Sequence, residues 1–262
     1  MEKYLKMQKE YYNDERISSE QVVGNYKWHE NFPYETQLLY KNGDMRMPLI
    51  TNSKEKYALD FGCGPGRMIN RMSKLFKRVD GVDISENLLI ESKQQHPDSN
   101  FYISSGKDTG SAPNDTYDFV YSTIAMQHIA VHSIRMDILK SIHKILKPGG
   151  VATIQMAFNA EYPYIIKRKD FKIKDFYIKI FKKQKIHAAW SEDRTNATST
   201  NSGCDVAINK DDLEKLKSDF SSIFKNVDYW FYDVSLIYQN LNGERHAPKY
   251  WPTHWIFIHG TK

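Results

Sequence analysis

Residues 59–67 read Leu59-Asp60-Phe61-Gly62-Cys63-Gly64-Pro65-Gly66-Arg67, and this stretch decides the fold. The apolar run that ends at Phe61 predicts a buried strand, and the segment after Gly66 has the pattern of a helix. Glycines between a strand and a helix let the main chain turn sharply and let a ligand approach it closely, because no Cβ is in the way. The sequence of the loop alone leaves two interpretations open, a ligand-binding loop or only a tight strand-to-helix turn.

Around this loop, short β-like segments alternate with helical patterns. Strands are expected at residues 57–61, 79–84, 100–104, 117–122 and 151–156. Isoleucines recur at helical spacing from Ile134 to Ile145, and we expect that helix to end at the run Lys147-Pro148-Gly149-Gly150. Asn209 is a predicted N-cap of a later helix, and residues 227–237 and 254–258 are β-rich. The alternation predicts an α/β fold with a parallel sheet and helices on both faces.

Acidic residues follow the predicted strands at one edge of this sheet. Asp83 ends the second strand, where a carboxylate can accept the hydroxyl groups of a ribose. The alternative role for Asp83 is a helix N-cap, which Ser85 can also supply. Asp108 follows the third strand in Gly106-Lys107-Asp108, either as the acceptor of an adenine amino group or as a plain loop acid. Because ligands of open α/β sheets bind at the carboxyl ends of the strands, we expect a nucleoside-containing ligand at this edge.

These residues together resemble the class I S-adenosylmethionine-dependent methyltransferases. The resemblance covers residues 57–158 and rests on five matches: Asp-x-Gly-x-Gly-x-Gly at residues 60–66, Asp83, Gly106-Lys107-Asp108, Tyr117-Asp118-Phe119-Val120 and Leu146-Lys147-Pro148-Gly149-Gly150. It implies a Rossmann-like, mostly parallel sheet of seven strands, whose antiparallel last strand at residues 254–258 lies between the fifth and the sixth. A nicotinamide- or flavin-binding loop has the spacing Gly-x-Gly-x-x-Gly instead, so an oxidoreductase is disfavoured.

The resemblance also predicts how the chain is organised. Residues 1–50 lack clear strands and are interpreted as an N-terminal helical cap or lid. Residues 51–262 are expected to form the methyltransferase domain, with residues 159–205 as an insertion on the substrate side after the fifth strand.

By the same resemblance, the cofactor is S-adenosylmethionine and the product is S-adenosylhomocysteine. Asp60 would brace the loop and meet the methionine ammonium through water, while Arg67 would either approach the methionine carboxylate or point to solvent. Asp83 would hold the ribose and Ile84 would flank the adenine. The expected cofactor-binding residues are Asp60, Gly62, Cys63, Gly64, Gly66, Arg67, Asp83, Ile84, Gly106, Lys107, Asp108, Ser122, Thr123 and Gln127.

The acceptor side is less well determined by the sequence. His128 follows the fourth strand, where the family faces the cofactor sulfur and the acceptor, so it is the first candidate for a base or an acceptor-orienting group. Its alternative is a structural histidine, and His29 is the second catalytic candidate. The further acceptor-side candidates are Tyr11, Tyr12, Trp28, His187 and Trp190. No metal site is expected.

The charge of this chain is concentrated in one segment. The 262 residues carry a net charge of +5, but residues 167–185 hold nine basic and two acidic residues, a local charge of +7. The rest of the chain is therefore at −2, which argues against a whole-molecule attraction to nucleic acid. The segment is interpreted either as a solvated amphipathic helix or as a basic surface for phosphate, nucleic acid or an anionic membrane. Two cysteines, and no apolar run long enough to cross a membrane, predict a cytoplasmic protein.

The sequence thus predicts a methyltransferase for a small-molecule acceptor, most readily at oxygen. The basic segment near the acceptor side favours an anionic acceptor, such as a phosphorylated or nucleotide-linked sugar or metabolite. The alternatives are a small-molecule N-methyltransferase, an RNA or protein methyltransferase and, from a different class, a non-catalytic cofactor-binding subunit. The sequence leaves open the acceptor itself, its reacting atom, the need for a base and the oligomeric state.

Overall fold

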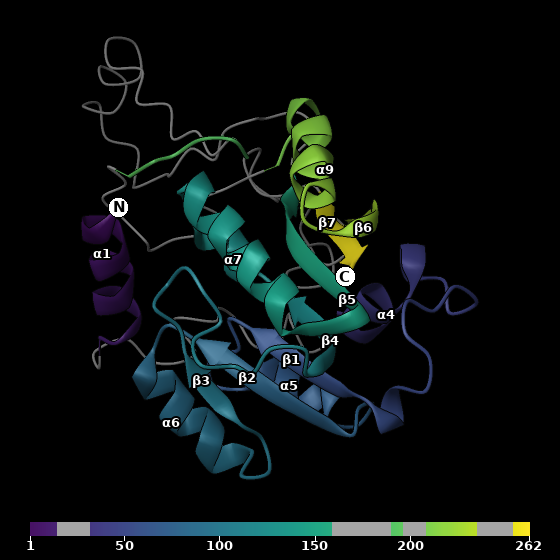
Figure 1. The fold of residues 1–262 in the computed structure, drawn as a ribbon, viewed down its shortest axis with the longest axis horizontal. Helices are drawn as coiled ribbons and strands as arrows, with labels where there is room; N and C mark the ends of the chain where they lie inside the picture. Colours follow the sequence, from purple (N-terminus) through teal and green to yellow (C-terminus); the bar gives the residue numbers. More distant parts are fainter. Residues whose placement is uncertain (15–31, 159–189, 196–207, 235–253) are drawn as a thin grey trace, which may run out of the picture.

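The computed structural model describes residues 1–14, 32–158, 190–195, 208–234 and 254–262. Its centre is a seven-stranded sheet in the order β3-β2-β1-β4-β5-β7-β6 (Figure 1). The strands are β1 (Tyr57–Phe61), β2 (Arg78–Asp83), β3 (Phe101–Ile103), β4 (Tyr117–Ser122), β5 (Leu146–Phe158), β6 (Lys225–Asp233) and β7 (His254–Thr261). β1 to β5 pair in parallel, and β7 is antiparallel to both β5 and β6. This arrangement confirms the predicted Rossmann-like sheet, including an antiparallel last strand between the fifth and the sixth.

Helices pack on both faces of the sheet (Figure 1). They are α1 (Glu2–Tyr12), α4 (Tyr34–Leu39), α5 (Arg67–Met72), α6 (Glu86–Gln95), α7 (His132–Ile145) and α9 (Leu213–Ser221), with the short 3-10 turns η1 (Lys41–Gly43), η2 (Ser53–Glu55), η3 (Ala125–His128) and η4 (Lys210–Asp212). One buried apolar cluster contains residues of α1, α7 and α9, and the other contains residues of α4, α5 and α6. The sheet therefore separates two cores.

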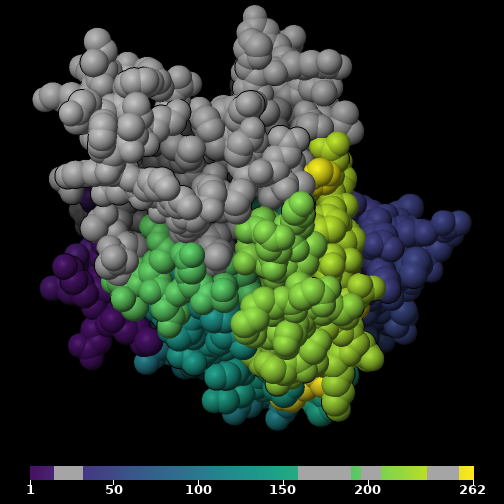
Figure 2. All heavy atoms as spheres, turned by 90° about the horizontal axis from the view of Figure 1, so that it is seen from above, coloured from purple at the N-terminus to yellow at the C-terminus, as the bar shows by residue number. Residues whose placement is uncertain are grey.

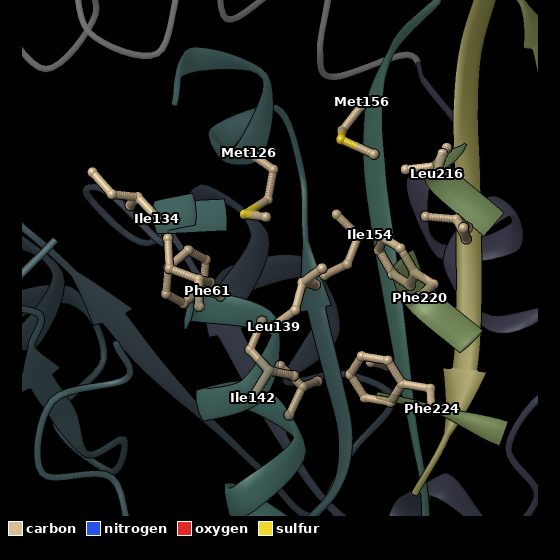
Figure 3. Packing of buried hydrophobic residues seen from close by; sticks show 14 of the residues in the cluster. Phe61, Met126, Ile134, Leu139, Ile142, Ile154, Met156, Leu216, Phe220 and Phe224 are labelled. Atoms are coloured by element: carbon tan, nitrogen blue, oxygen red, sulfur yellow. The ribbon is translucent and has the colours of Figure 1, made fainter. Parts of the chain in front are cut away.

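The periodic isoleucines of α7 supply much of the first core. Ile134, Ile138, Ile142 and Ile145 are all buried, as their helical spacing predicts. Figure 3 shows Ile134, Leu139 and Ile142 of α7 together with Ile154 and Met156 of β5 and with Phe220 of α9. α9 reaches this position through a capping box, in which the Asn209 side chain accepts from the Asp211 nitrogen and the Asp212 side chain accepts from the Asn209 nitrogen.

The connection between α7 and β5 differs from the prediction. The helix ends at Ile145 and β5 begins at Leu146, so Lys147-Pro148-Gly149-Gly150 belongs to the strand instead of forming the end of the helix. The physical reason is that proline disfavours helical dihedrals in the residue before it, so the chain is already extended at Lys147. Leu146 pairs with Tyr117 of β4, which extends the sheet at this edge.

The described parts of the N-terminal fifty residues lie in two separate places. α1 packs with its buried Tyr4 in the first core, whereas α4 packs with Tyr34 and Leu38 in the second. Figure 1 shows α1 and α4 at opposite sides of the molecule. Between them, residues 15–31 lie outside the described residues.

A short segment, residues 190–195, is described within the expected substrate-side insertion. It lies between the purple atoms of α1 and the yellow-green atoms of α9 in Figure 2. Val131 and Asp193 form an antiparallel bridge, and the Arg194 nitrogen donates to the Ala130 carbonyl at 3.1 Å. This part of the insertion is therefore tied to the loop that follows β4. The basic segment 167–185 lies outside the described residues.

Candidate functional site

The loop between β1 and α5 adopts the backbone that its glycines allow. Gly62, Gly64 and Gly66 all have positive φ, at 77°, 51° and 91°. The Gly62 nitrogen donates to the Val82 carbonyl of β2 at 2.8 Å, which ties the loop to the neighbouring strand. A Cβ on Gly62 would lie 2.3 Å from the Cβ of Ala125, so no other residue fits there without moving the chain after β4.

This loop forms one wall of a cavity at the carboxyl ends of the central strands. The cavity encloses about 1000 Å³ including its open mouth. It is lined by Tyr4, Gln8 and Tyr12 of α1, by Asp60, Phe61, Gly62, Cys63, Gly64, Arg67, Met68, Asp83, Ile84, Leu88, Ser104 and Gly106, and by Thr123, Ile124, Ala125, His128, Ile129 and Ile138. A space of this size and position is typical of a binding site for a nucleoside-containing ligand.

Asp83 connects the end of β2 to the glycine loop. Its Oδ2 accepts from the Gly64 nitrogen at 2.9 Å, and its Oδ1 accepts from the Ser85 nitrogen at 2.9 Å. Burial raises the pKa of this carboxyl, although the two hydrogen bonds oppose the shift. Ser85 caps α6 through its own hydroxyl, which accepts from the Leu88 nitrogen. The alternative role of Asp83 as the N-cap is therefore taken by its neighbour.

Asp60 and Arg67 place an acidic and a basic side chain on the same cavity wall. Asp60 is almost fully buried, and among the described residues its Oδ1 has no hydrogen-bond partner. Burial raises the pKa of Asp60 to about 8, with Arg67 opposing the shift and Asp83 adding to it. The Arg67 Nε is also buried without a partner among the described residues. Buried polar atoms without partners are costly, so their presence in a cavity points to a ligand or to water.

The chain after β4 forms a strained turn over the loop. Ile124 has φ 69° and ψ −31°, and the Ala125 nitrogen donates to the Thr123 carbonyl at 2.8 Å, which makes a γ-turn. A β-branched residue rarely adopts positive φ, and such a conformation costs about 1–3 kcal/mol. The buried side chain of Gln155 on β5 accepts from the Ile124 nitrogen at 2.7 Å and holds the turn. Strain of this kind is often found at functional sites.

The opposite wall of the cavity is α1, and sequence reasoning missed two of its residues. Tyr4 and Gln8 are the buried residues of that helix, and both line the cavity. The Tyr4 hydroxyl accepts from the Ala130 nitrogen at 2.8 Å and from Gln8 at 2.7 Å, and it donates to the His128 carbonyl. Their spacing of four residues, which puts both on one helix face, was the available signal.

Eleven of the predicted residues come together in the cavity wall: Asp60, Gly62, Cys63, Gly64, Arg67, Asp83, Ile84, Gly106, Thr123, His128 and Tyr12. His128 ends η3, directly after the strained turn. Burial raises the pKa of the Cys63 thiol, so this side chain is protonated and packs in the wall instead of acting as a nucleophile. His29, Trp28 and His187 lie outside the described residues.

The remaining predicted residues do not line this cavity. Gly66 packs on α6, because a Cβ there would meet the Ser92 hydroxyl at 2.6 Å. Lys107 is exposed, Tyr11 packs edge-on against Tyr12, and Gln127 is buried within η3. The Ser122 hydroxyl donates to the Phe61 carbonyl at 2.8 Å and so joins β4 to β1.

Asp108 makes the contacts of its alternative role, that of a loop acid, and its place beside an adenine stays a prediction. Its carboxylate accepts from the nitrogens of Ser105 and Gly110 at 3.0 and 2.9 Å, and so closes its own loop. Although partial burial opposes the shift, hydrogen bonds from Ser105 and Gly110 lower the pKa of Asp108. The carboxylate therefore serves the turn in which it lies.

Trp190 corrects the expectation of an acceptor-side aromatic. The ring is fully buried in the first core, its Nε1 donates to Asp219 of α9 at 2.8 Å, and the Arg135 guanidinium lies 4.9 Å from the ring centroid. The sequence could not indicate this position, because Asp219 and Arg135 are far from Trp190 along the chain. Trp190 anchors the end of the insertion to the body of the protein.

The described residues hold neither a metal-binding cluster nor a membrane-spanning helix. There, no group of three or more His, Cys, Asp or Glu side chains is arranged to hold a metal ion. None of the helices in the same ranges has both the length and the apolarity needed to cross a lipid bilayer.

Comparison with known proteins agrees with this geometry. Residues 59–154 match the family model described as a methyltransferase domain. Trans-aconitate 2-methyltransferase of Variovorax paradoxus is 31% identical over 120 residues, which cover 45% of this chain and 44% of that protein. Malonyl-[acyl-carrier protein] O-methyltransferase of Salmonella typhimurium is 24% identical over 134 residues, 50% of this chain and 51% of that protein. The chain thus spans about half the length of the curated relatives it matches.

Structural similarity extends further along the chain. Phosphoethanolamine N-methyltransferase 2 of Haemonchus contortus, solved in complex with S-adenosyl-L-methionine, superposes with a TM-score of 0.57 at 14% identity. The superposition covers 97% of this chain and 59% of that one. The glycine loop, the strand order and the family match agree that residues 59–154 form a methyltransferase domain, and the superposition shows that the chain shares the fold of that solved protein.

Proposed function

We propose that this chain binds S-adenosylmethionine in the cavity and transfers its methyl group to an oxygen atom of a small anionic acceptor. The observation that carries the proposal is the convergence of Asp83, the glycine loop and the Asp60–Arg67 pair on one cavity. A carboxylate for a ribose and two opposite charges for an amino acid correspond to the two ends of this cofactor. The cavity, the loop and the family match all support the proposal.

The residues present fit the cofactor. Gly62 and Gly106 line the cavity without a side chain. A Cβ on Gly106 would lie 2.9 Å from Leu5 and 3.0 Å from Ile84, so glycine leaves this space open. The buried Oδ1 of Asp60 and the buried Nε of Arg67, without partners among the described residues, would meet the methionine ammonium and carboxylate. Asp83 would hold the ribose, and Ile84 would flank the adenine.

When bound, S-adenosylmethionine supplies a methyl group on an activated sulfonium, ready for in-line displacement. The chain itself then has to align the acceptor with that methyl group and keep water away. Tyr4, Gln8 and Tyr12 of α1 and His128 on η3 are placed to do so, because they line the cavity from the side opposite the glycine loop.

Two features support an anionic oxygen acceptor. The names of the relatives refer to trans-aconitate and to a malonyl group, which are both carboxylic acid species. The second feature is the +7 charge of residues 167–185, which follow β5 in the sequence. A carboxylate or phosphate oxygen is already ionised at neutral pH and would need no general base, in contrast to an alcohol.

A turnover assay tests the proposal. Formation of S-adenosylhomocysteine would be followed with carboxylates such as trans-aconitate, with sugar phosphates and with the neutral methyl esters of the same carboxylates. We expect turnover with an anionic compound and none with its neutral ester. Absence of saturable S-adenosylmethionine binding, or full activity of Asp83→Ala, would refute the function.

His128 allows the acceptor chemistry to be separated further. If the reacting oxygen belongs to a carboxylate or phosphate, His128→Gln should retain kcat within about tenfold and change mainly KM. If it belongs to an alcohol, the same substitution should lower kcat by about 10²–10⁴-fold, the usual contribution of a general base.

The role of the basic segment is tested by charge reversal. Replacing Lys167, Arg168 and Lys169 with Glu should raise the KM of an anionic acceptor and leave cofactor binding unchanged. An unchanged KM would remove the segment from acceptor recognition, and co-sedimentation with anionic liposomes would then test it as a membrane contact.

A further inference from the structure

One side chain in the second core contacts Arg67, a residue of the cavity wall. Tyr34, the first residue of α4, is fully buried between Phe32 and Trp255, with ring centroids 4.5 and 5.5 Å away. The Arg67 guanidinium lies 5.0 Å from the Tyr34 ring centroid and donates a hydrogen bond to its hydroxyl. The packing fixes the Tyr34 ring, so the guanidinium of Arg67 rests on a rigid platform.

The neighbouring Arg71 also lies over the Tyr34 ring, 5.4 Å from its centroid, but it differs from Arg67 in having a carboxylate partner. Arg71 forms an ion pair with Glu35 and donates to the Phe32 carbonyl at 2.8 Å. Arg67, one helical turn earlier, has no carboxylate within ion-pair distance among the described residues, and its buried Nε has no partner there. Of these two guanidinium groups, it is Arg67 that lines the cavity.

A partly buried guanidinium without an anion has a high desolvation cost, which a planar carboxylate offsets through two parallel hydrogen bonds. The correct angle of the guanidinium plane matters for such bidentate binding, and a stacked, hydrogen-bonded arginine loses little rotational freedom when the anion arrives. We propose that Tyr34 is a positioning residue, which orients Arg67 to bind the carboxylate at the methionine end of S-adenosylmethionine.

This inference rests on the proposed function but goes beyond it, because Tyr34 lies 33 positions before Arg67 and outside the matched domain. It predicts that a substitution of Tyr34 changes the affinity only of ligands that carry the amino-acid part. A merely structural role in anchoring α4 would weaken all ligands of the cavity alike.

The test compares two probes by titration calorimetry. S-adenosylhomocysteine carries the carboxylate, whereas 5′-methylthioadenosine keeps the nucleoside and sulfur but lacks the amino-acid part. We expect Tyr34→Phe to weaken S-adenosylhomocysteine about tenfold, the effect of one hydrogen bond at the upper end of its range, and to leave 5′-methylthioadenosine unchanged. Arg67→Met should weaken S-adenosylhomocysteine about 10- to 100-fold, again with no effect on the shorter probe.

Two further variants complete the design. Glu35→Gln breaks the neighbouring Glu35–Arg71 ion pair on the same helix and is the matched control, expected to change the affinity of neither probe. In the double variant, Tyr34→Phe should have no additional effect once Arg67 is Met, since its influence acts through that guanidinium.

The outcomes separate the inference from the function on which it rests. Equal weakening of both probes by Tyr34→Phe, or no weakening of either, would overturn the positioning role while leaving cofactor binding intact. Failure of the unsubstituted protein to bind either probe would instead overturn the proposed function.

Discussion

The carboxylate of Asp83 accepts a hydrogen bond from the main-chain nitrogen of Gly64, with 2.9 Å between the two atoms. One side chain at the end of β2 therefore holds the glycine loop in place from across the neighbouring strand. Each carboxylate oxygen has two acceptor positions, so Asp83 can brace the loop and still accept ribose hydroxyl groups. The proposed ribose role would couple loop geometry to ligand affinity through this one residue.

This coupling predicts a large effect of Asp83→Asn. An amide presents a donor in place of one acceptor oxygen, so either the Gly64 bond or a ribose contact is lost. Because hydrogen bonds to charged groups contribute about 1.5–3 kcal/mol, S-adenosylmethionine affinity should fall about 10- to 100-fold. Glu86→Gln, which neutralises an exposed acid three residues away, is the control and should bind normally. Calorimetry checks both, and unchanged affinity in Asp83→Asn would contradict the ribose role.

The raised pKa of Asp60 leads us to predict that cofactor binding releases a proton. With a pKa of about 8, its carboxyl is mostly protonated at pH 7 in the free cavity, and an ammonium group beside it favours the ionised form. Binding of S-adenosylmethionine at pH 7 should therefore release close to one proton, seen as a dependence of the binding enthalpy on the ionisation enthalpy of the buffer. Asp60→Asn should abolish most of this dependence. Identical buffer dependence in both proteins would contradict the assignment.

The same residue predicts a pH dependence of stability. Because the folded pKa of Asp60 lies above its unfolded value, the native state binds the extra proton, and the free energy of unfolding falls as pH rises from about 4 to about 8. In the ligand-free protein, Asp60→Asn should therefore become more stable relative to the unsubstituted chain as pH rises over this range. Denaturant unfolding at pH 5 and pH 8 measures the change, and a constant difference between the two proteins would contradict it.

The hydrogen bond to Gln155 leads us to predict that the strained turn at Ile124 depends on this one acceptor. Gln155→Leu keeps the volume but leaves the Ile124 nitrogen without its partner, which should lower the free energy of unfolding by about 1–3 kcal/mol and weaken cofactor binding. Thr153→Val is the matched control on the same strand. Its buried hydroxyl has no partner among the described residues, so this change should be neutral or stabilising. Urea unfolding and calorimetry distinguish the two variants, and equal effects would contradict the role of Gln155.

The hydrogen bonds of Tyr4 lead us to predict that α1 controls the release of the cofactor. Tyr4→Phe removes the acceptor of the buried Ala130 nitrogen and the contact to Gln8, at a cost of about 1–3 kcal/mol. We expect faster hydrogen exchange in α1 and about tenfold faster dissociation of S-adenosylhomocysteine, measured by stopped flow. Lys3→Ala, an exposed change on the same helix, should leave the rate unaltered. A normal rate in Tyr4→Phe would show that α1 does not limit exit.

The sequence determined the sheet and eleven of the residues that line the cavity. The signals for the sheet are local: they are the strand and helix patterns, the glycine loop and Asp83. Each depends on residues within a short stretch that form a turn or end a strand. For that reason β1 and β4 begin and end where their residues predict, and the antiparallel β7 lies where the resemblance implies. The exchange of helix for strand at Lys147 had a local cause as well, in Pro148.

Only the tertiary structure decided which distant residues join the site. Tyr4 and Gln8 reach the cavity from α1, Tyr34 contacts Arg67 from α4, and Gln155 holds the turn at Ile124 from β5. Packing on either face of the sheet brings them there. Packing likewise placed Trp190 in the core and turned Asp108 to its own loop. The chemistry of a side chain determines what it can bind. Its burial and its tertiary contacts decide whether it faces the ligand or stabilises the fold.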